Sequence, residues 1–134
     1  METVIDGNIT IHKAGPAGFG NNIYLVVDNV SEVAAFIDAP DEVEQSYAVV
    51  EAVGIEPSYI LLTHSHPDHV ASIKPLKTRY GCQLIADPEE PWIPKGTLDS
   101  EVKDGDLVEV GSLKFTVLGI PGHTPASTAF IWGE

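Results

Sequence analysis

The stretch YILLTHSHPDH, residues 59–69, joins a short apolar run to a polar loop that carries three of the five histidines. Four apolar residues before such a loop predict a strand buried inside a sheet. Beyond the loop the pattern favours a helix over about residues 70–80, closed by Gly81, with Pro75 bending or restarting it. A strand, a polar loop and a helix in succession predict an α/β unit here.

The segments on either side of this unit are mostly strands. Residues 6–7 and 111–112 are candidate hairpin turns, and Asp41 is a candidate cap for a helix that runs to about residue 53 and stops at Gly54. Strands with interleaved helices predict an α/β or α+β fold with a mixed sheet whose helices cover one side at most. The predicted strands lie within residues 4–11, 23–27, 33–37, 59–62, 82–86, 107–110, 113–118 and 127–132, and irregular loops cover residues 15–20 and 87–100.

Length and composition indicate a folded protein. We expect a single domain over residues 1–134, because this length suits one core and is too short for two ordinary ones. Hydrophobic residues make up 43% and charged residues 20%, and no apolar run is long enough to cross a bilayer. The start of the chain lacks the features of a secretory signal. A lone cysteine, Cys82, cannot form an internal disulfide, so we expect a cytoplasmic protein in which this thiol is inert core.

The charge balance bears on partners. Seven Lys and Arg residues against 20 Asp and Glu residues give a formal net charge of −13. A field of that sign repels nucleic-acid phosphates, so we expect a small-molecule substrate and neither a nucleic acid nor a membrane as partner. The alternative is that the acidity serves only to keep the protein in solution.

The histidine-rich loop has the composition of a metal site. Zinc binds imidazole nitrogen and carboxylate oxygen, and catalytic zinc sites use three protein ligands plus water. His64 and His66 are two residues apart and can point to one ion, whereas Asp68 and His69 can face a second ion beside it. A packing role does not explain these residues, because burying them without partners would be costly. The alternative is an incidental patch of surface histidines.

A second loop offers a further ligand. His123 lies in PGHTP, residues 121–125, where proline and glycine predict a tight backbone that exposes one imidazole. Alone it would be an ordinary loop histidine, but beside the first cluster it supplies a third ligand. His12 has no such neighbours, and we expect it to be structural or exposed.

These motifs resemble those of a known family. THSHPDH, residues 63–69, resembles the T-H-x-H-x-D-H signature of the metallo-β-lactamase superfamily, and PGHT, residues 121–124, resembles its P-G-H-T motif. Residues 22–28 and 36–38 are similar to the opening strands of that family. The resemblance runs from about residue 9 to residue 132. It implies the αβ/βα sandwich fold of the family, with one αβ half largely represented in this chain.

The resemblance also implies roles for individual residues. His64, His66 and His123 would hold one metal ion, and Asp68 and His69 the second. Asp38, Thr63 and Thr124 would lie next to the ligands, where such residues orient imidazoles. Asp38 has an equal alternative as an ordinary turn or helix-start aspartate.

The sequence departs from the family pattern at its end. Members continue into a second αβ half that supplies a bridging aspartate and a further histidine, and no histidine follows His123 here. We therefore expect the chain to be C-terminally incomplete and to expose an apolar face of its sheet, which a homodimer through that face would cover. Ser72 stands where many members have glycine, which is expected to alter how the helix packs.

The implied activity is metal-dependent hydrolysis. A metal-bound hydroxide would attack a small ester or thioester carbonyl, and Asp68 would orient or deprotonate the attacking water. Two zinc ions are expected in a complete enzyme, with iron or manganese as alternatives. The hydroxyacylglutathione hydrolase-like branch is the most similar. The alternative is a half-domain that binds metal or self-associates without turnover.

Overall fold

The computed structural model describes residues 1–16, 20–122 and 124–133, and within them the chain forms two sheets and three helices. The larger sheet has the strand order β1-β2-β3-β4-β5-β6-β7, and the smaller sheet has the order β10-β9-β8. The strands of the larger sheet are β1 (Glu2–Asp6), β2 (Ile9–Ala14), β3 (Ile23–Asp28), β4 (Ala34–Ile37), β5 (Pro57–Leu61), β6 (Gln83–Ala86) and β7 (Leu98–Glu101). The remaining elements are α1 (Val43–Val53), α2 (Pro67–Val70), α3 (Ile73–Tyr80), β8 (Leu107–Val110), β9 (Leu113–Gly119) and β10 (Thr128–Trp132).

The larger sheet changes from antiparallel to parallel at β4. Strands β1 to β4 pair antiparallel, whereas β4, β5, β6 and β7 pair parallel. Parallel neighbours need crossover connections, which α1 provides between β4 and β5, and α2 with α3 provides between β5 and β6. The carboxyl ends of β4, β5 and β6 therefore meet at one edge of the sheet. The predicted α/β or α+β class with a mixed sheet is confirmed.

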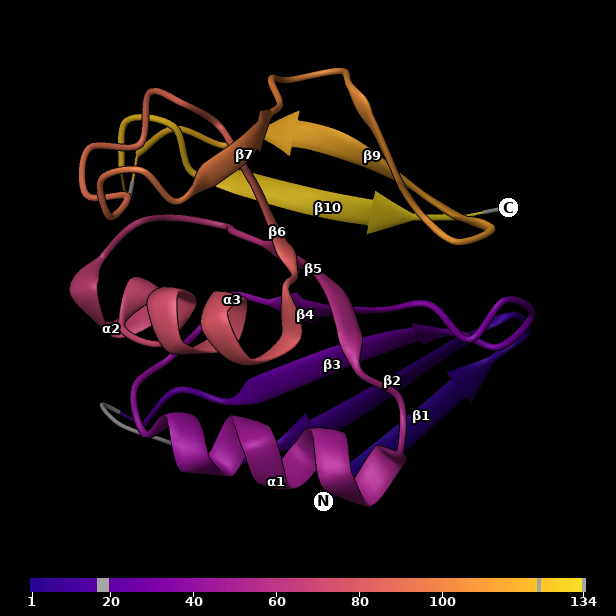
Figure 1. Cartoon of the computed structure of the whole chain (residues 1–134). Helices are drawn as coiled ribbons and strands as arrows, with labels where there is room; N and C mark the ends of the chain where they lie inside the picture. The colour runs from indigo at the N-terminus through magenta and orange to yellow at the C-terminus, as the bar shows by residue number, and fades with distance from the viewer. Residues whose placement is uncertain (17–19, 123, 134) are drawn as a thin grey trace.

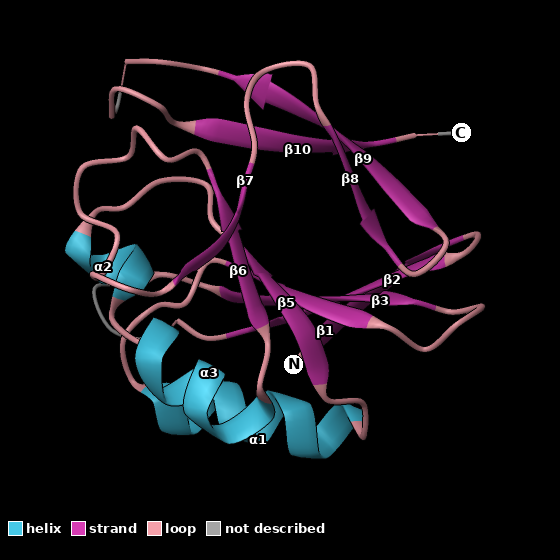
Figure 2. Cartoon of the chain, turned by 45° about the horizontal axis from the view of Figure 1, so that its top comes forward, coloured by secondary structure: helices cyan, strands magenta, loops and turns pink. Residues whose placement is uncertain are grey.

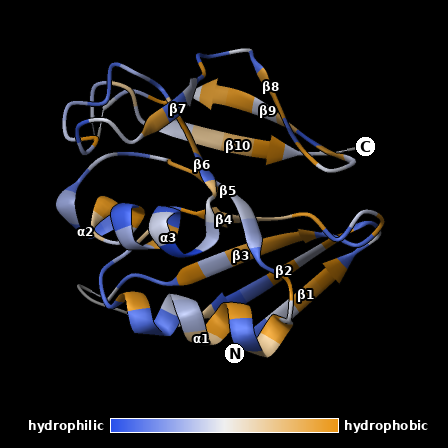
Figure 3. Ribbon diagram, viewed as in Figure 1, coloured by the Kyte–Doolittle hydropathy of each residue, from blue (hydrophilic) through white to orange (hydrophobic). Residues whose placement is uncertain are grey.

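Alternation along the strands divides the larger sheet into two faces. Phe36 and Leu84 point to the face that α1 and α3 cover, and their neighbours Ala35 and Ile85 point to the opposite face. Figure 2 shows the helices on one side of the sheet, in accordance with the prediction that they cover one side at most. In Figure 3, α1 carries both hydrophobic and hydrophilic residues, as a helix with one buried side requires.

The smaller sheet packs on the other face (Figure 1). Side chains from β8 and β9 form a second buried cluster with the larger sheet. Among them are Val110, Leu113, Phe115 and Val117. The expectation of an uncovered apolar face is therefore wrong over much of that face. What remains uncovered is a groove of about 490 Å³, whose walls include Val4, Ile11, Tyr24, Phe130 and Trp132.

Asp28, at the end of β3, connects the two sheets. Its carboxylate accepts hydrogen bonds from the backbone N–H of Ser112 (2.6 Å) and from the Ser112 hydroxyl (2.8 Å), in the turn between β8 and β9. It also accepts bonds from Val30 and Ser31 in its own loop. Gly111 has φ 60°, and a Cβ there would collide with Asp28 and Ser31, so this close approach requires glycine.

Three details differ from the sequence-based expectations. The N-terminal boundary of α1 is Glu42 instead of Asp41, and Asp41 accepts a hydrogen bond from the Glu42 N–H. The expected helix over residues 70–80 is two helices that break at Ser72, which places Pro75 in the first turn of α3, where proline is tolerated. The expected loop of residues 87–100 ends in β7, because pairing with β6 makes a strand of a segment without an apolar pattern.

Candidate metal centre

Within the described residues, the side chains predicted to hold metal or to orient its ligands lie at the edge where the parallel strands end. Asp38 directly follows β4, the loop of residues 63–66 follows β5, and residues 87–92 follow β6. Figure 1 shows α2 and the loops after β6 and β9 on the same side of the molecule. Loops at the carboxyl ends of parallel strands converge, and open α/β sheets place their binding sites there.

Asp38 holds the histidine loop in place. Its backbone is in the left-handed region, with φ 63°, and its N–H donates to the carbonyl of Leu61 in β5 (2.9 Å). Its carboxylate accepts bonds from the Thr63 N–H (2.6 Å), the Thr63 hydroxyl (2.6 Å) and Nδ1 of His69 (2.7 Å). An uncommon backbone conformation supported by this many contacts is typical of functional sites.

These contacts assign the ring nitrogens of two histidines. Because the hydroxyl of Thr63 donates to Asp38, its contact with Nδ1 of His64 (2.9 Å) requires Nδ1 of His64 to carry the proton. His69 likewise donates from Nδ1 to Asp38. In the neutral form of both rings the lone pair is then on Nε2, the nitrogen that can bind a metal ion.

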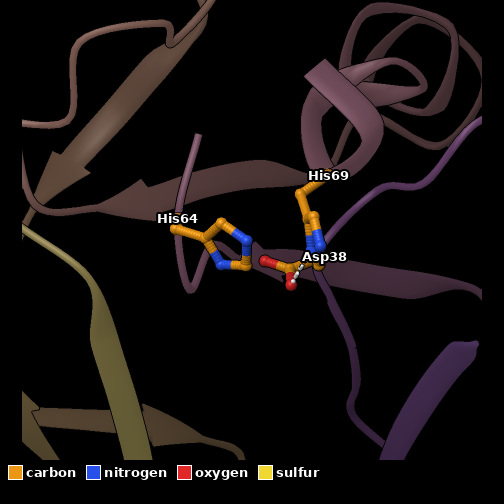
Figure 4. Close-up of side chains that lie close together, drawn as sticks. All are labelled: Asp38, His64 and His69. Carbon is orange, nitrogen blue, oxygen red and sulfur yellow. Dashed lines mark hydrogen bonds and ion pairs between the residues drawn. The ribbon is translucent and has the colours of Figure 1, made fainter. Parts of the chain in front are cut away.

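The site brings donor atoms close together. One ligand atom each from Asp38, His64 and His69 lie within 4.8 Å of one another, and both rings point toward the carboxylate (Figure 4). The ring centroids of His64 and His69 are 3.9 Å apart, and those of His64 and His66 are 5.2 Å apart. Imidazoles oriented by a carboxylate and a hydroxyl fit a transition-metal ion. The oxygens of Asp38 already accept three hydrogen bonds, which favours an orienting role for this residue.

Asp68 and His69 lie side by side. Nε2 of His69 is 3.5 Å from Oδ2 of Asp68, which also accepts a hydrogen bond from Asn21 (2.9 Å). The Asn21 bond and the nearby charge of His69 lower the pKa of Asp68 despite its partial burial. Burial lowers the pKa of His69, but the hydrogen bond and charge of Asp38, with the charge of Asp68, outweigh it and raise the pKa overall.

The second predicted loop is described in part. His123 lies outside the described residues. Thr124, which follows it, is buried and contacts Ser127 and Glu90. The two loops also meet directly, because the N–H of Thr128 donates to the carbonyl of Thr63 (2.8 Å).

Three residues near the site escaped the sequence analysis as candidates: Asn21, Glu90 and Trp92. Glu90 is buried and bonds to both loops. Trp92 is 55% exposed, and its ring centroid is 5.6 Å from that of His66. No motif marks these positions, and the signal available for Glu90 and Trp92 is the placement of residues 87–92 after a parallel strand. His12 contacts Thr3 through Nδ1 in β2, away from the cluster.

The helices of the described part of the chain include none that is long and apolar enough to cross a membrane.

A curated protein is similar in sequence to most of this chain. A hydroxyacylglutathione hydrolase of Rhodopseudomonas palustris (strain HaA2) is 38% identical over 111 residues, which is 83% of this chain and 43% of the relative. The chain thus spans less than half the length of the curated relative that it matches.

Solved structures share the fold. A crystal structure of ETHE1 from Myxococcus xanthus matches with a TM-score of 0.80 and 25% identity, over 92% of this chain and 53% of that one. A protein crystallised in a di-iron-bound form matches with a TM-score of 0.71 and 31% identity, over 90% and 65%. The sequence profile of the metallo-beta-lactamase superfamily matches residues 17–134. The resemblance noted in the sequence is confirmed, and this chain belongs to the metallo-β-lactamase superfamily.

Proposed function

We propose that this chain carries the metal-binding loops of a hydrolase that cleaves small esters or thioesters. The observation that carries the proposal is the orientation of His64 and His69. Thr63 and Asp38 engage Nδ1 of the two rings, whose centroids are 3.9 Å apart, so that Nε2 is the nitrogen of each neutral ring that can bind a metal ion. A bound cation would account for this arrangement, because gathering imidazoles and a carboxylate in one place does not improve apolar packing and costs desolvation.

The ligand sets follow the family pattern. His64, His66 and His123 would hold one ion, and Asp68 and His69 would contribute to a second. Zinc suits these donors, and iron or manganese would be accepted by the same atoms. A bound metal ion supplies Lewis-acid chemistry, which polarises a carbonyl and makes water a better nucleophile at neutral pH.

The remaining residues would orient and move protons. Asp38 and Thr63 fix the imidazoles. Asp68, held by Asn21 through its side-chain oxygen, would orient the attacking water and accept its proton. Trp92 presents an exposed ring next to His66, which would form one apolar wall for the acyl group. A thioester is the favoured substrate class because the matched relative from Rhodopseudomonas palustris is named for hydroxyacylglutathione.

The test combines metal content with turnover. Protein purified without chelator is expected to contain at least one metal ion per chain by elemental analysis, and to hydrolyse a hydroxyacylglutathione faster than a matched oxoester. His66→Ala is expected to lose metal and at least about 100-fold in turnover, because it removes a ligand. His12→Ala, a histidine outside the cluster, serves as the control. Metal-free wild-type protein, together with unchanged turnover in His66→Ala, would contradict the proposal.

The second candidate is metal binding without turnover, in a chain that also self-associates. The groove beside β10 favours self-association, because its apolar walls are open and a second copy of the chain could cover them. Size-exclusion chromatography with light scattering, combined with the hydrolysis assay on the same peak, distinguishes the two candidates. A dimer that binds metal and hydrolyses none of the substrates would support the second candidate, and a catalytically active monomer would exclude it.

A further inference from the structure

Glu90 is a buried carboxylate between the two loops of the site. It is 5% exposed and lies in the connection between β6 and β7. Acidic side chains are rarely buried to this extent without a specific set of partners. The partners of Glu90 come from both loops that carry the proposed ligands.

Both carboxylate oxygens are engaged. Oε1 accepts hydrogen bonds from the N–H of Ser65 (2.6 Å) and the hydroxyl of Thr124 (2.9 Å). Oε2 accepts a bond from the N–H of Ala126 (3.0 Å). Three donors satisfy a buried carboxylate, and bonds to an ionised acceptor are stronger than neutral ones.

Two of the three donors are sequence neighbours of the proposed metal ligands. Ser65 stands between His64 and His66, and Thr124 directly follows His123. Fixing the N–H of Ser65 fixes the backbone from which two histidines leave. The hydroxyl of Ser65 in turn accepts a bond from the N–H of Trp92 (3.0 Å), so the segment that carries Glu90 is itself attached to this loop.

Other contacts hold each loop from its own side. Asp38 fixes the first loop to β4, and pairing of β9 with β10 closes the second. The Thr128–Thr63 backbone bond joins them at the start of β10. Glu90 instead bonds to Thr124 and Ala126, which follow His123 in the second loop.

We propose that Glu90 is a positioning residue that sets the spacing of the two loops and thereby the metal affinity of the site. The inference rests on the metal-binding part of the proposed function and is independent of the substrate. Residues that orient metal ligands from behind typically contribute 10- to 100-fold to affinity.

The decisive variant is Glu90→Gln. It keeps the side-chain length, but its NH2 group cannot accept a hydrogen bond and would face either the N–H of Ala126 or the N–H of Ser65, so at least one bond to a loop backbone is lost. Zn²⁺ affinity, measured by competition with a chromophoric chelator, is expected to fall at least about 10-fold. The absorption spectrum of the Co²⁺ form is expected to change, because its intensity reports the ligand arrangement.

Asp28→Asn is the matched control, because Asp28 is also a buried carboxylate with several donors but lies at the opposite end of β3 from the site. It is expected to lower stability while leaving Zn²⁺ affinity within about twofold, as expected for a residue remote from the ligands. Equal affinities of Glu90→Gln and wild type would overturn the inference. So would an equal loss of affinity in both variants, since that would reflect general destabilisation.

A second pair of variants keeps the inference testable if Glu90→Gln does not fold. Thr124→Val removes one of the three donors at constant shape and is expected to weaken Zn²⁺ binding about threefold to tenfold. Thr124→Ser retains the hydroxyl and is expected to restore affinity. Unchanged affinity in Thr124→Val contradicts the role of Glu90. Failure of the wild-type chain to bind any metal overturns the proposed function as well, which separates the two failures.

Discussion

The two faces of the larger sheet are covered in different ways. Helices α1 and α3 close one face, and a continuous cluster that includes Phe36, Leu76 and Leu84 fills the space beneath them. The smaller sheet covers the other face in part and leaves a groove next to Phe130 and Trp132. The same strands supply both faces by alternation, so the difference lies in what covers them.

This contrast teaches where stability and function reside. A closed face buries apolar side chains completely, so truncating one of them lowers the free energy of unfolding by a large amount. On the face with the groove, buried residues lie nearer β8 and β9, and the sheets are held together by Asp28 at one end. We expect the closed face to dominate the free energy of unfolding, and three variants test this contrast.

The largest effect is expected for Phe36→Ala, on the closed face. Phe36 is 1% exposed, and removing its ring should lower the free energy of unfolding by about 4 kcal/mol, because the cavity cannot collapse. Urea denaturation of metal-free protein measures this. If the variant does not fold, Phe36→Leu should lose about 1 to 1.5 kcal/mol. A loss below about 1 kcal/mol in the alanine variant would place the stability elsewhere.

An intermediate effect is expected for Asp28→Asn, which weakens the connection between the sheets. Burial raises the pKa of Asp28, but the bonds from Ser31, Ser112 and Val30 outweigh it and bring the pKa well below its ordinary value. The ionised carboxylate therefore stabilises the fold above the unfolded-state pKa of about 4. At pH 7 the variant should lose about 2 to 3 kcal/mol.

The pH dependence of this loss sharpens the test. The stabilisation by ionised Asp28 is fully present above about pH 4, and it is lost as the pH falls through the lowered folded-state pKa. The difference in unfolding free energy between wild type and Asp28→Asn should therefore be constant from about pH 5 to pH 8 and should shrink below about pH 4. A difference that grows on acidification would contradict this role.

The smallest effect is expected for Phe130→Ala, at the groove. Phe130 is half-buried and lines an open space, so truncation should cost about 1 kcal/mol or less, well under the effect at Phe36. The same urea titration measures both phenylalanines under identical conditions. A loss at Phe130 equal to that at Phe36 would show that something covers the groove in solution, and light scattering would then test for a second copy.

Local patterns predicted much of the fold. Gly54 and Gly81 end helices with φ of 80° and 68°, and apolar runs such as residues 59–62 mark buried strands. β7 was missed, because LDSE has no apolar alternation and becomes a strand only through pairing with β6. The coverage of the second face was also missed, since it depends on how two sheets pack rather than on any local pattern.

The site divides in the same way. Ligand types and spacing pointed to residues 64–69 because metal chemistry restricts the side chains that can serve. Glu90 and Asn21 could not be predicted, because their roles come from partners 25 to 47 residues away. The metal-ligand roles of His64, His66, Asp68, His69 and His123 stay predictions that metal analysis can test.

The long reach of those contacts has a kinetic consequence. Asp38 meets His69 across 31 residues, and Glu90 meets Thr124 across 34. Closing such loops is slow compared with forming a helix or a hairpin. High-affinity metal uptake should therefore begin only after β4, β5 and β6 have paired, so that a metal-responsive dye added during refolding would time the last step of folding and not its first.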